Sequence, residues 1–584
     1  CTLARTAVGY RETKQTQRRK TLRMGCGAST PVGGAESAGA SEIATLRKKV
    51  EGLEKELKNA KENGSVATPG APSTAGGLRT YDVPMCVMAD SYKASHFLMY
   101  PECKSMTAYG EFREPMKGML TNGQQDNRFV FYGMRHYIEN FVSRRWTMAD
   151  IDAADAFYKT HKAGGDMFLF PRDLYVKFIK ENDGYFPVTI EALPEGTVAY
   201  IHTPVFIISA HEEYSRLCTF LETILTMIWY PSCVATLSRY SHDAIKEGFD
   251  KSVDDDMRFL LDGRLHDFGF RGCTSVEQSI LGGSAHLLSF EGSDTMSACY
   301  NVQFNLNGGR AVGTSIPATE HSVMTAWPNE EEAIRNQIKH FGAGPFATVM
   351  DSYDYDRALN EVLPTVAPLV KAANGTMVIR PDSGDPVTQV IKGLKAAEKT
   401  FGSSLNGKGF KVIQGAAVIQ GDGINYGTLR EIQEAVLAEG YSCQNVAYGM
   451  GGALLQKLNR DTMSFATKLS HIVYANGEHR DVMKTPKSSA AKTSLPGQLF
   501  VGRAGPGASP VVYPRGDPAC KGLEAVMHVV YNKRPVPGVF EDFSSVQARL
   551  NREWAAVPPN GNPISPQLQI KINDVLRSRG WKVD

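Results

Sequence analysis

Arg380 and Asp382 stand in the segment GTMVIRPDSGDPV, residues 375–387, where charged groups have no evident structural task. The apolar run 377–379, bounded by glycine and proline, predicts a short strand. The turn that follows needs only the proline, aspartate and glycine of PDSG. An arginine at this strand end therefore predicts a binding loop for a polar or anionic ligand.

Loops of the same kind recur along the chain, each after an apolar run and before a helix-like stretch. Their sequences are HDFGFRG, FEGSDT, PATEHS, MDSYD, IRPDSGDP, IQGDG and YGMGGA. The steps between them are 27, 26, 31, 31, 40 and 27 residues, counted through Asp267, Asp294, Glu320, Asp351, Asp382, Asp422 and Gly449. Steps of this size suit successive strand-loop-helix units with parallel crossovers. The pattern predicts an α/β barrel whose loops meet over one site.

The chemistry of these loops is that of a ligand with ribose and phosphate groups. Carboxylates accept hydrogen bonds from ribose hydroxyls, whereas arginine forks and the backbone N–H groups of a helix start bind phosphate. Gly451 and Gly452 open the helix-like stretch ALLQKL and would let the backbone approach a phosphate. His321, preceded by Glu320, lies at a strand end, and no HExxH or GxSxG signature competes with it.

The composition is that of a globular enzyme. Of 584 residues, 42% are hydrophobic and 22% charged, and the net charge of +2 gives no large basic field for nucleic acid. The sequence contains no run of about 18 apolar residues, which is the length needed to span a bilayer. The ten cysteines form no CxxC pair or zinc spacing, as expected of thiols in a reducing compartment.

Four regions can be distinguished along the chain. Residues 1–80 are poor in aromatics and predict a disordered tail. Within the tail, heptad spacing over 42–62 indicates either a short coiled coil or a solvated single helix, on Ile43, Leu46, Val50, Leu53 and Leu57. An α+β domain is expected over 81–262, the barrel over 263–480, and a C-terminal segment, 481–584, that packs back on the α+β domain.

The first methionine, Met24, opens the sequence MGCGAST. If translation starts there, Gly25 fits the N-myristoylation pattern, and Cys26 could carry the second acyl chain that stable anchoring requires. The preceding Arg-rich residues fit the end of a transit peptide equally well, and chance matching is a third interpretation. The expected location is the cytoplasm, with membrane association if Gly25 is acylated.

Taken together and in order, the motifs ADSYKASH, LHDFGFRG, FEGSDT, IPATEHSVMTAW, MDSYD, IRPDSGDP, VIQGDG and YGMGGALLQKLNRD resemble the nicotinamide phosphoribosyltransferase family. The resemblance covers residues 81–584. It implies a type II phosphoribosyltransferase: a homodimer with an irregular α/β barrel and shared active sites. The implied reaction joins nicotinamide to the phosphoribosyl group of phosphoribosyl pyrophosphate in NAD salvage.

The resemblance also implies roles for individual residues. Phe268 and the partner's Tyr92 would sandwich the pyridine ring, while Arg271 and Asp294 would bind the carboxamide. The ribose and phosphate would be held by Arg380, Asp382, Asp422, Gly451 and Gly452. The pyrophosphate and ATP side would be formed by Arg113, Lys93, Arg460 and Lys468. Two departures from the family pattern, Ala347 and Ala466, leave the tunnel and pyrophosphate contacts open.

In the family, ATP transiently phosphorylates the histidine that matches His321. Glu320 and Asp351 would then orient the imidazole. Mg²⁺ is implied as the companion of ATP and pyrophosphate, with no dedicated protein cage required. ATP is therefore expected as a coupled co-substrate.

Two alternatives remain open at this point. A nicotinate phosphoribosyltransferase would have the same barrel and would differ in the residue that faces the carboxamide. A membrane-tethered, non-catalytic binding protein would belong to a different class, and the intact Asp382, His321, Arg271 and Gly451 argue against it.

Overall fold

The computed structural model describes residues 83–121, 123–161, 170–486 and 493–580. The chain divides into two compact units, Cys1–Asp82 and Val83–Asp584, and all the described residues belong to the second. The expected tail, its heptad segment 42–62 and the acylation candidates Gly25 and Cys26 lie outside them.

The first layer is a six-stranded sheet in which every neighbouring pair is antiparallel. Its central strand β1 (Cys103–Glu111) is almost wholly buried, because helices and loops cover both faces. In order across the sheet, the strands are β16 (His479–Asp481), β15 (Ala466–Tyr474), β1, β7 (Pro204–His211), β5 (Thr189–Ala192) and β20 (His528–Asn532).

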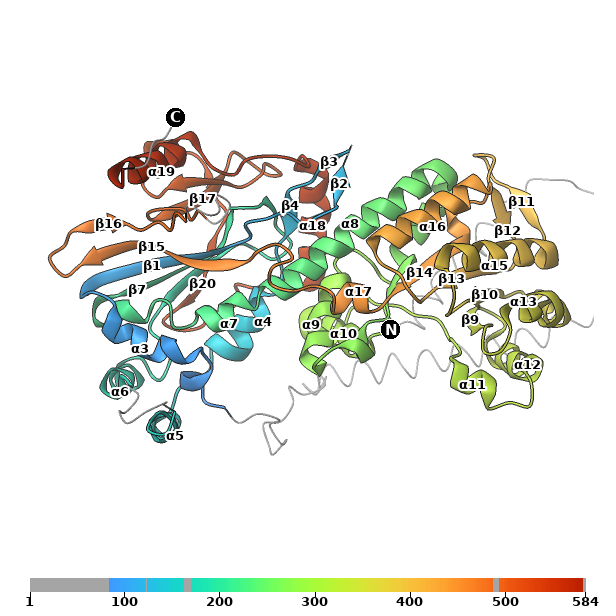
Figure 1. Cartoon of the computed structure of the whole chain (residues 1–584), viewed down its shortest axis with the longest axis horizontal. Coiled ribbons are helices and arrows are strands. Elements are labelled where there is room, and N and C mark those ends of the chain that lie inside the picture. Colours follow the sequence, from blue (N-terminus) through green and yellow to red (C-terminus); the bar gives the residue numbers. More distant parts are fainter. Residues whose placement is uncertain (1–82, 122, 162–169, 487–492, 581–584) are drawn as a thin grey trace, which may run out of the picture. The chain divides into compact units, whose positions relative to one another are not determined.

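The second sheet is parallel and carries the predicted loops (Figure 1). Its order is β8 (Leu265–Asp267), β14 (Val446–Met450), β13 (Ala416–Gln420), β10 (Thr376–Arg380) and β9 (Pro345–Val349). Isolated parallel bridges continue from β8 back to β9 through Asp267↔Ser293, Gly292↔Thr314 and Ala318↔Ala347. The seven predicted strand positions therefore form one irregular barrel, which confirms the expected fold class.

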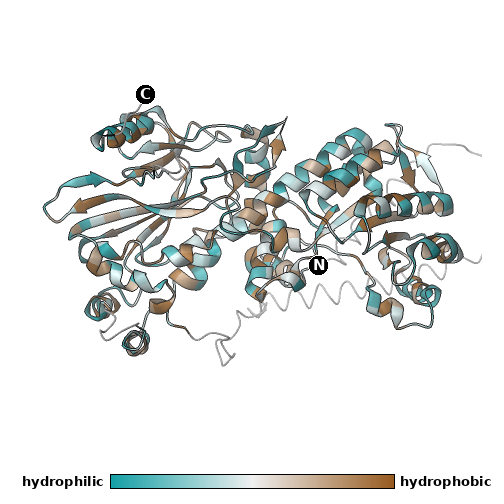
Figure 2. Cartoon of the chain, in the orientation of Figure 1, coloured by the Kyte–Doolittle hydropathy of each residue, from teal (hydrophilic) through white to brown (hydrophobic). Residues whose placement is uncertain are grey.

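Helices pack around the barrel because each has one apolar face. In α15 (Pro386–Phe401), the buried residues recur at helical spacing, at Val390, Leu394, Ala397 and Phe401. Figure 2 shows hydrophobic and hydrophilic residues alternating around these helices. On the same side as α15 lies α16 (Tyr426–Ala438), which also contacts the long α8 (Trp229–Ser252).

Sequence-local caps fix where the helices begin. Asp385 accepts a hydrogen bond from the Thr388 backbone N–H, and Pro386 occupies the first turn of α15. The PDSG loop is therefore confined to the few residues between β10 and this cap.

Two strands of the range expected for the barrel belong elsewhere. β15 falls before residue 480 and β16 begins at residue 479, yet both lie in the six-stranded sheet, where β15 pairs with β1 from Cys103↔Tyr474 to Glu111↔Ala466. Unlike the barrel strands, β15 is followed by a direct antiparallel return to β16 rather than by a crossover helix.

The C-terminal segment returns to the first sheet. β20 pairs antiparallel with β5, and α18 (Phe543–Ala556) contacts β6 (Val198–Tyr200). A further helix, α19 (Pro566–Ser578), contacts β18 (Val511–Pro514) of a small three-stranded sheet with β17 (Leu499–Arg503) and β19 (Glu524–Ala525).

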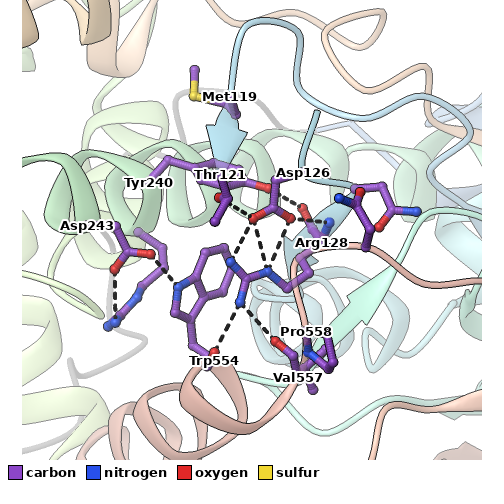
Figure 3. Close-up of polar contacts among 12 residues, drawn as sticks. Met119, Thr121, Asp126, Arg128, Tyr240, Asp243, Trp554, Val557 and Pro558 are labelled. Carbon is purple, nitrogen blue, oxygen red and sulfur yellow. Dashed lines mark hydrogen bonds and ion pairs between the residues drawn. The ribbon is translucent and has the colours of Figure 1, made fainter. Parts of the chain in front are cut away.

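A buried arginine joins the N-terminal and C-terminal parts (Figure 3). Arg128, in β4 (Arg128–Val130), pairs with Asp126 at 2.6 Å and donates to the carbonyls of Trp554 and Val557 at 3.1 and 2.9 Å. Its guanidinium carbon lies 3.9 Å from the centroid of the Trp554 ring. The C-terminal helix is thereby held against a strand more than 400 residues earlier.

Among the described residues, no helix combines the length and the apolar character that crossing a bilayer requires.

Candidate active site

A cavity of about 480 Å³ opens at the carboxyl ends of the barrel strands. Its wall is formed by residues that follow different strands. Among them are Phe268 and Arg271 after β8, Asp294, Glu320 and Arg380, together with Ala347 from β9. The structure thus brings five of the predicted site residues, together with the departure Ala347, to one site, as expected for loops at one end of a parallel barrel.

Phe268 provides an aromatic surface in this cavity. A Cβ atom on Gly449 would lie 2.1 Å from Phe268 Cε2, and one on Gly421 would lie 2.9 Å from the same atom. Glycines at the ends of β13 and β14 therefore make room for the ring. The guanidinium carbon of Arg380 lies 5.3 Å from the ring centroid. A flat, weakly polar ligand could stack on such a surface.

Asp294, which lines the same cavity as Phe268, provides a carboxylate that can accept hydrogen bonds. Its Oδ1 accepts a hydrogen bond from the Ser315 hydroxyl at 2.7 Å, and His266 Nδ1 lies 3.3 Å from its Oδ2. The Asp294 side chain is 39% exposed, so the carboxylate remains accessible to a ligand. Arg271, in a short 3₁₀ turn (Phe270–Gly272), lines the same cavity and adds a donor.

Arg380 and Asp382, at the end of β10 and in the loop that follows it, contact one another. Arg380 Nη2 donates to Asp382 Oδ1 at 2.8 Å. The Asp382 backbone N–H donates to Asp351 Oδ2 at 2.8 Å, and Ser383 Oγ donates to the same oxygen at 2.5 Å. Asp351 is thus a buried anchor for the loop after β10.

His321 lies at the start of α11 (His321–Thr325) beside two carboxylates. Its Nε2 is 3.5 Å from Asp382 Oδ2 and 3.9 Å from Asp351 Oδ1, and its Nδ1 is 3.1 Å from Ser352 Oγ. The imidazole is 46% exposed and can reach a ligand.

The contacts around His321 differ in one respect from the expected orientation by Glu320 and Asp351. The Glu320 carboxylate accepts a hydrogen bond from Ser322, two residues along the chain, while Asp382 takes a place beside the imidazole. Glu320 directly precedes His321 at the start of α11, and its carboxylate turns toward the first turn of that helix rather than toward the His321 imidazole.

A second buried carboxylate, Asp267, lies beneath Asp294. Burial, opposed by a hydrogen bond from the Gly269 N–H, raises the pKa of Asp267 to about 6. The neighbouring Asp294 charge contributes to this rise in the pKa. This end of the cavity therefore disfavours additional negative charge.

Asp422, Gly451 and Gly452 lie at the same end of the barrel, outside the cavity wall. Gly451 follows β14, and Gly452 opens α17 (Gly452–Leu455), which is only four residues long. Asp422 follows β13 and is exposed. Of the three, Asp422 follows the strand that pairs with β10, whereas Gly451 and Gly452 follow β14, one strand further away.

A second group of predicted residues lies on or beside the six-stranded sheet and does not line the cavity. Tyr92, in α3 (Ser91–Met99), is 53% exposed, and the adjacent Lys93 pairs with Glu222. Arg113 Nε donates to the Ser464 carbonyl at 2.8 Å. Burial lowers the pKa of Lys468, and Arg460 lies 3.8 Å from Asp461.

The two departures from the family pattern have different positions. Ala347 is buried in β9 and lines the cavity, where it contributes only a methyl group. Ala466 is the first residue of β15, next to Arg113 and its partner Ser464 in the second group.

The residues of the site that the sequence does not predict include His266, Ser315 and Ser352. His266 directly precedes Asp267 in LHDFG, so its strand-end position was a usable signal. Ser315 and Ser352 have no such sequence signal, because a serine in a loop belongs to no distinctive pattern. Its role becomes visible only when the structure shows which residue it contacts.

Comparison with known proteins agrees with this geometry. Residues 263–532 match the nicotinate phosphoribosyltransferase (NAPRTase) family, and residues 84–190 match the nicotinamide phosphoribosyltransferase N-terminal domain. The structure is similar to that of human nicotinic acid phosphoribosyltransferase, with a TM-score of 0.54 and 16% identity over 83% of this chain and 99% of that one. At that identity the likeness concerns the fold.

Two curated relatives carry the name nicotinamide phosphoribosyltransferase. The protein from Acinetobacter baylyi is 31% identical over 71% of this chain and 87% of its own length. The protein from Xanthomonas campestris pv. campestris is 40% identical over 70% of this chain and 86% of its own length. This similarity shows that the chain belongs to the nicotinamide phosphoribosyltransferase family, and the barrel with its strand-end site agrees with that assignment.

Proposed function

We propose that this enzyme transfers the phosphoribosyl group of phosphoribosyl pyrophosphate to nicotinamide, forming nicotinamide mononucleotide and pyrophosphate in NAD salvage. The observation that carries the proposal is the composition of one cavity. It combines the Phe268 surface with Asp294, Arg271 and Arg380, and Asp382 lies beside it, paired with Arg380.

The nicotinamide ring stacks on Phe268 in this proposal. The carboxamide NH₂ donates to Asp294, and the carboxamide oxygen accepts from Arg271. These contacts match the donors and acceptors of an uncharged amide, whereas the carboxylate of nicotinate would face Asp294 with like charge. Asp294 is therefore the residue that selects the base.

The ribose hydroxyls are held by Asp382 and the nucleotide phosphate by Arg380, with Asp422, Gly451 and Gly452 at the same rim. In the reaction, the bond from ribose C1 to the pyrophosphate oxygen breaks, and the pyridine nitrogen lone pair forms the new C1–N bond. The ribose acquires oxocarbenium character that nearby carboxylates stabilise. The pyridine nitrogen is already unprotonated at neutral pH, so no general base is required.

His321 then serves phosphoryl transfer from ATP rather than base catalysis. One imidazole nitrogen attacks the γ-phosphorus and ADP leaves, so that an N–P bond replaces the P–O bond. Contacts with Asp351, Asp382 and Ser352 support this role, because they hold the exposed ring in a fixed orientation.

The pyrophosphate side is completed by a second subunit in this proposal. Tyr92, Lys93, Arg113, Arg460 and Lys468 do not line this chain's own cavity, and Tyr92 is exposed. A homodimer would bring the partner's Tyr92 onto the face of the pyridine ring. Mixing a Tyr92→Ala subunit with an Asp382→Ala subunit should restore about a quarter to a half of the activity if the sites are shared.

Magnesium enters as the counter-ion of the pyrophosphate and ATP. The described residues contain no group of three or more His, Cys, Asp or Glu side chains arranged to hold a metal ion. We expect the phosphate oxygens to supply most of the Mg²⁺ ligands.

Membrane association through acylated Gly25 and Cys26 remains a proposal that rests on the sequence motif. If Met24 is the start, Gly25→Ala should move the protein from the membrane to the cytoplasmic fraction. A cytoplasmic wild type with an unmodified N-terminus, established by mass spectrometry, would contradict it.

An assay of the purified protein with nicotinamide and nicotinate in parallel tests the proposed reaction. We expect nicotinamide mononucleotide as the product, with nicotinate used poorly. Preference for nicotinate would assign the sister activity, nicotinate phosphoribosyl transfer. Failure to convert either base would favour the alternative of a non-catalytic binding protein.

A further inference from the structure

The carboxylate of Asp294 is held from two sides by side chains to which the proposed reaction gives no role. Ser315 donates to Oδ1 at 2.7 Å, and His266 Nδ1 lies 3.3 Å from Oδ2. The three residues come from three successive strand positions of the barrel, and all line the cavity. One group therefore approaches each oxygen of Asp294.

The His266 imidazole is closely confined. Its side chain is 12% exposed, and Nδ1 is buried and forms no hydrogen bond among the described residues, although Asp294 Oδ2 lies 3.3 Å from it. A Cβ atom on Gly292 would lie 2.8 Å from His266 Cδ2. The absence of a side chain at position 292 thus leaves room for the ring in this orientation.

Two contacts of this kind restrict a carboxylate that is otherwise free to turn. The Asp294 side chain is 39% exposed, and an aspartate on a loop can adopt several rotamers. The Ser315 hydrogen bond to one oxygen and the close approach of His266 to the other restrict the plane of the carboxylate before the base binds. Each oxygen keeps a second lone pair that can accept the NH₂ of a carboxamide.

We propose that His266 and Ser315 are positioning residues that fix Asp294 as the reader of the carboxamide, and thereby set the preference for nicotinamide over nicotinate. The inference rests on the proposed function, since it assigns the base-reading role to Asp294. His266 and Ser315 act through Asp294 and do not contact the reacting atoms. Without them, Asp294 turns away more readily, binds nicotinamide less well and excludes nicotinate less strictly.

Paired variants separate this role from a general structural one. Ser315→Ala and His266→Leu remove the donors. Ser315→Thr keeps a hydroxyl, and His266→Asn keeps an N–H near the position of Nδ1. Ser404→Ala, on β11 (Ser403–Leu405), and His340→Asn, at the exposed end of α12 (Glu330–Phe341), are controls for the loss of a serine and a histidine elsewhere.

The readouts are kcat and KM for both bases at saturating phosphoribosyl pyrophosphate, in the purified full chain. Loss of either donor should raise the KM for nicotinamide about tenfold and leave kcat within about twofold. The ratio of kcat/KM for nicotinate to that for nicotinamide should rise about tenfold with it. The Thr and Asn variants and both controls should stay within about threefold of the wild type.

The same substitution in a protein that already lacks Asp294 tests whether Ser315 acts through Asp294. In an Asp294→Ser protein, the further change Ser315→Ala should leave the base preference unchanged, because the residue through which Ser315 acts is gone. Equal losses for both bases, failure of the Thr and Asn variants to retain selectivity, or a full effect of Ser315→Ala in the Asp294→Ser background would overturn the inference.

Failure of the inference can be distinguished from failure of the proposed function. If Asp294→Ser changes base preference and neither Ser315→Ala nor His266→Leu does, only the positioning role is wrong. If Asp294→Ser itself leaves the preference unchanged, the base-reading role proposed for Asp294 is wrong, and the inference falls with it. Melting temperatures identify variants that fail to fold, and the Thr and Asn variants keep the test decisive in that case.

Discussion

Asp351 and Asp382 follow neighbouring strands of the barrel and are joined directly: the Asp382 backbone N–H donates to Asp351 Oδ2 at 2.8 Å. The Asp351 side chain is only 4% exposed, while Asp382 is 21% exposed and faces His321. A buried carboxylate thus fixes the loop that presents Arg380 and Asp382. The same pair of aspartates connects the loop proposed to bind ribose with the histidine proposed to accept phosphate from ATP.

Asp382→Ala should lower kcat/KM by about 100-fold or more, because it removes the proposed ribose acceptor from a site built to bind charge and hydroxyl groups. The melting temperature should change little, since the side chain lies on a loop at the rim of the barrel. Steady-state kinetics and thermal unfolding measure the two effects.

Asp385→Ala is the matched control for this prediction. Asp385 caps α15, so its loss should cost about 1 kcal/mol of stability. It should leave kcat/KM close to the wild-type value. An Asp382→Ala enzyme with normal kcat/KM would refute the ribose role.

His321→Ala should retain slow formation of nicotinamide mononucleotide and lose the stimulation by ATP. The reason is that the pyridine nitrogen needs no base, so His321 contributes only through phosphoryl transfer. Rates with and without ATP, in wild type and variant, measure this. Equal stimulation of both proteins by ATP would contradict the proposal. Complete loss of the reaction without ATP would assign His321 to the phosphoribosyl transfer step itself.

Much of the barrel could be predicted because its signals are local. Each strand end combines an apolar run with a glycine, aspartate or proline turn, and Asp385 with Pro386 marks the start of α15. Parallel crossovers then determine that Asp267, Asp294 and Asp382 meet at one end. The positions of these site residues follow from topology alone.

The contacts of the site could not be predicted in the same way. Ser315 and His266 approach Asp294 from neighbouring strands, and Asp382 takes the place beside His321 that sequence adjacency suggested for Glu320. Such contacts depend on rotamers and on the register between strands. Strand β15 was likewise assigned to the barrel range, because its pairing with β1 joins residues more than 350 positions apart.

The raised pKa of Asp267 predicts that the stability of the protein depends on pH in a specific way. Burial raises the pKa of Asp267 to about 6, above the ordinary value of 3.8. The folded state therefore binds a proton that the unfolded state releases, and the resulting stabilisation is complete below about pH 4 and is lost as the pH rises through 6. Replacing Asp267 by a neutral residue should therefore help wherever Asp267 is ionised in the unfolded state, which begins at about pH 4.

Asp267→Asn tests this dependence, because the amide oxygen can still accept from the Gly269 N–H. Relative to wild type, the variant should gain stability between about pH 4 and 6, up to about 2–3 kcal/mol at pH 7. Urea unfolding at pH 4, 5, 6 and 7 measures the difference. A difference that does not vary with pH would show that Asp267 is not protonated on folding in this range.

Arg128→Ala should destabilise the protein by about 3–5 kcal/mol, because it leaves Asp126 buried without its charged partner and removes the contact with Trp554. Denaturant unfolding measures the loss. The double variant Arg128→Met with Asp126→Leu should recover part of it, since neither buried charge then remains. Equal unfolding midpoints for Arg128→Ala and wild type would contradict a role in joining the C-terminal helix to β4.

The most direct measurement is kcat/KM for nicotinamide and for nicotinate in wild type and in Asp294→Ser. The wild type should strongly prefer nicotinamide, because the carboxylate of Asp294 accepts from an amide and repels an acid. The variant should use nicotinamide less well and nicotinate better, with Arg271 still present to hold the oxygens of the new substrate. A wild type that prefers nicotinate, or a variant in which both values fall by the same factor, would contradict the assignment of Asp294 as the residue that selects the base.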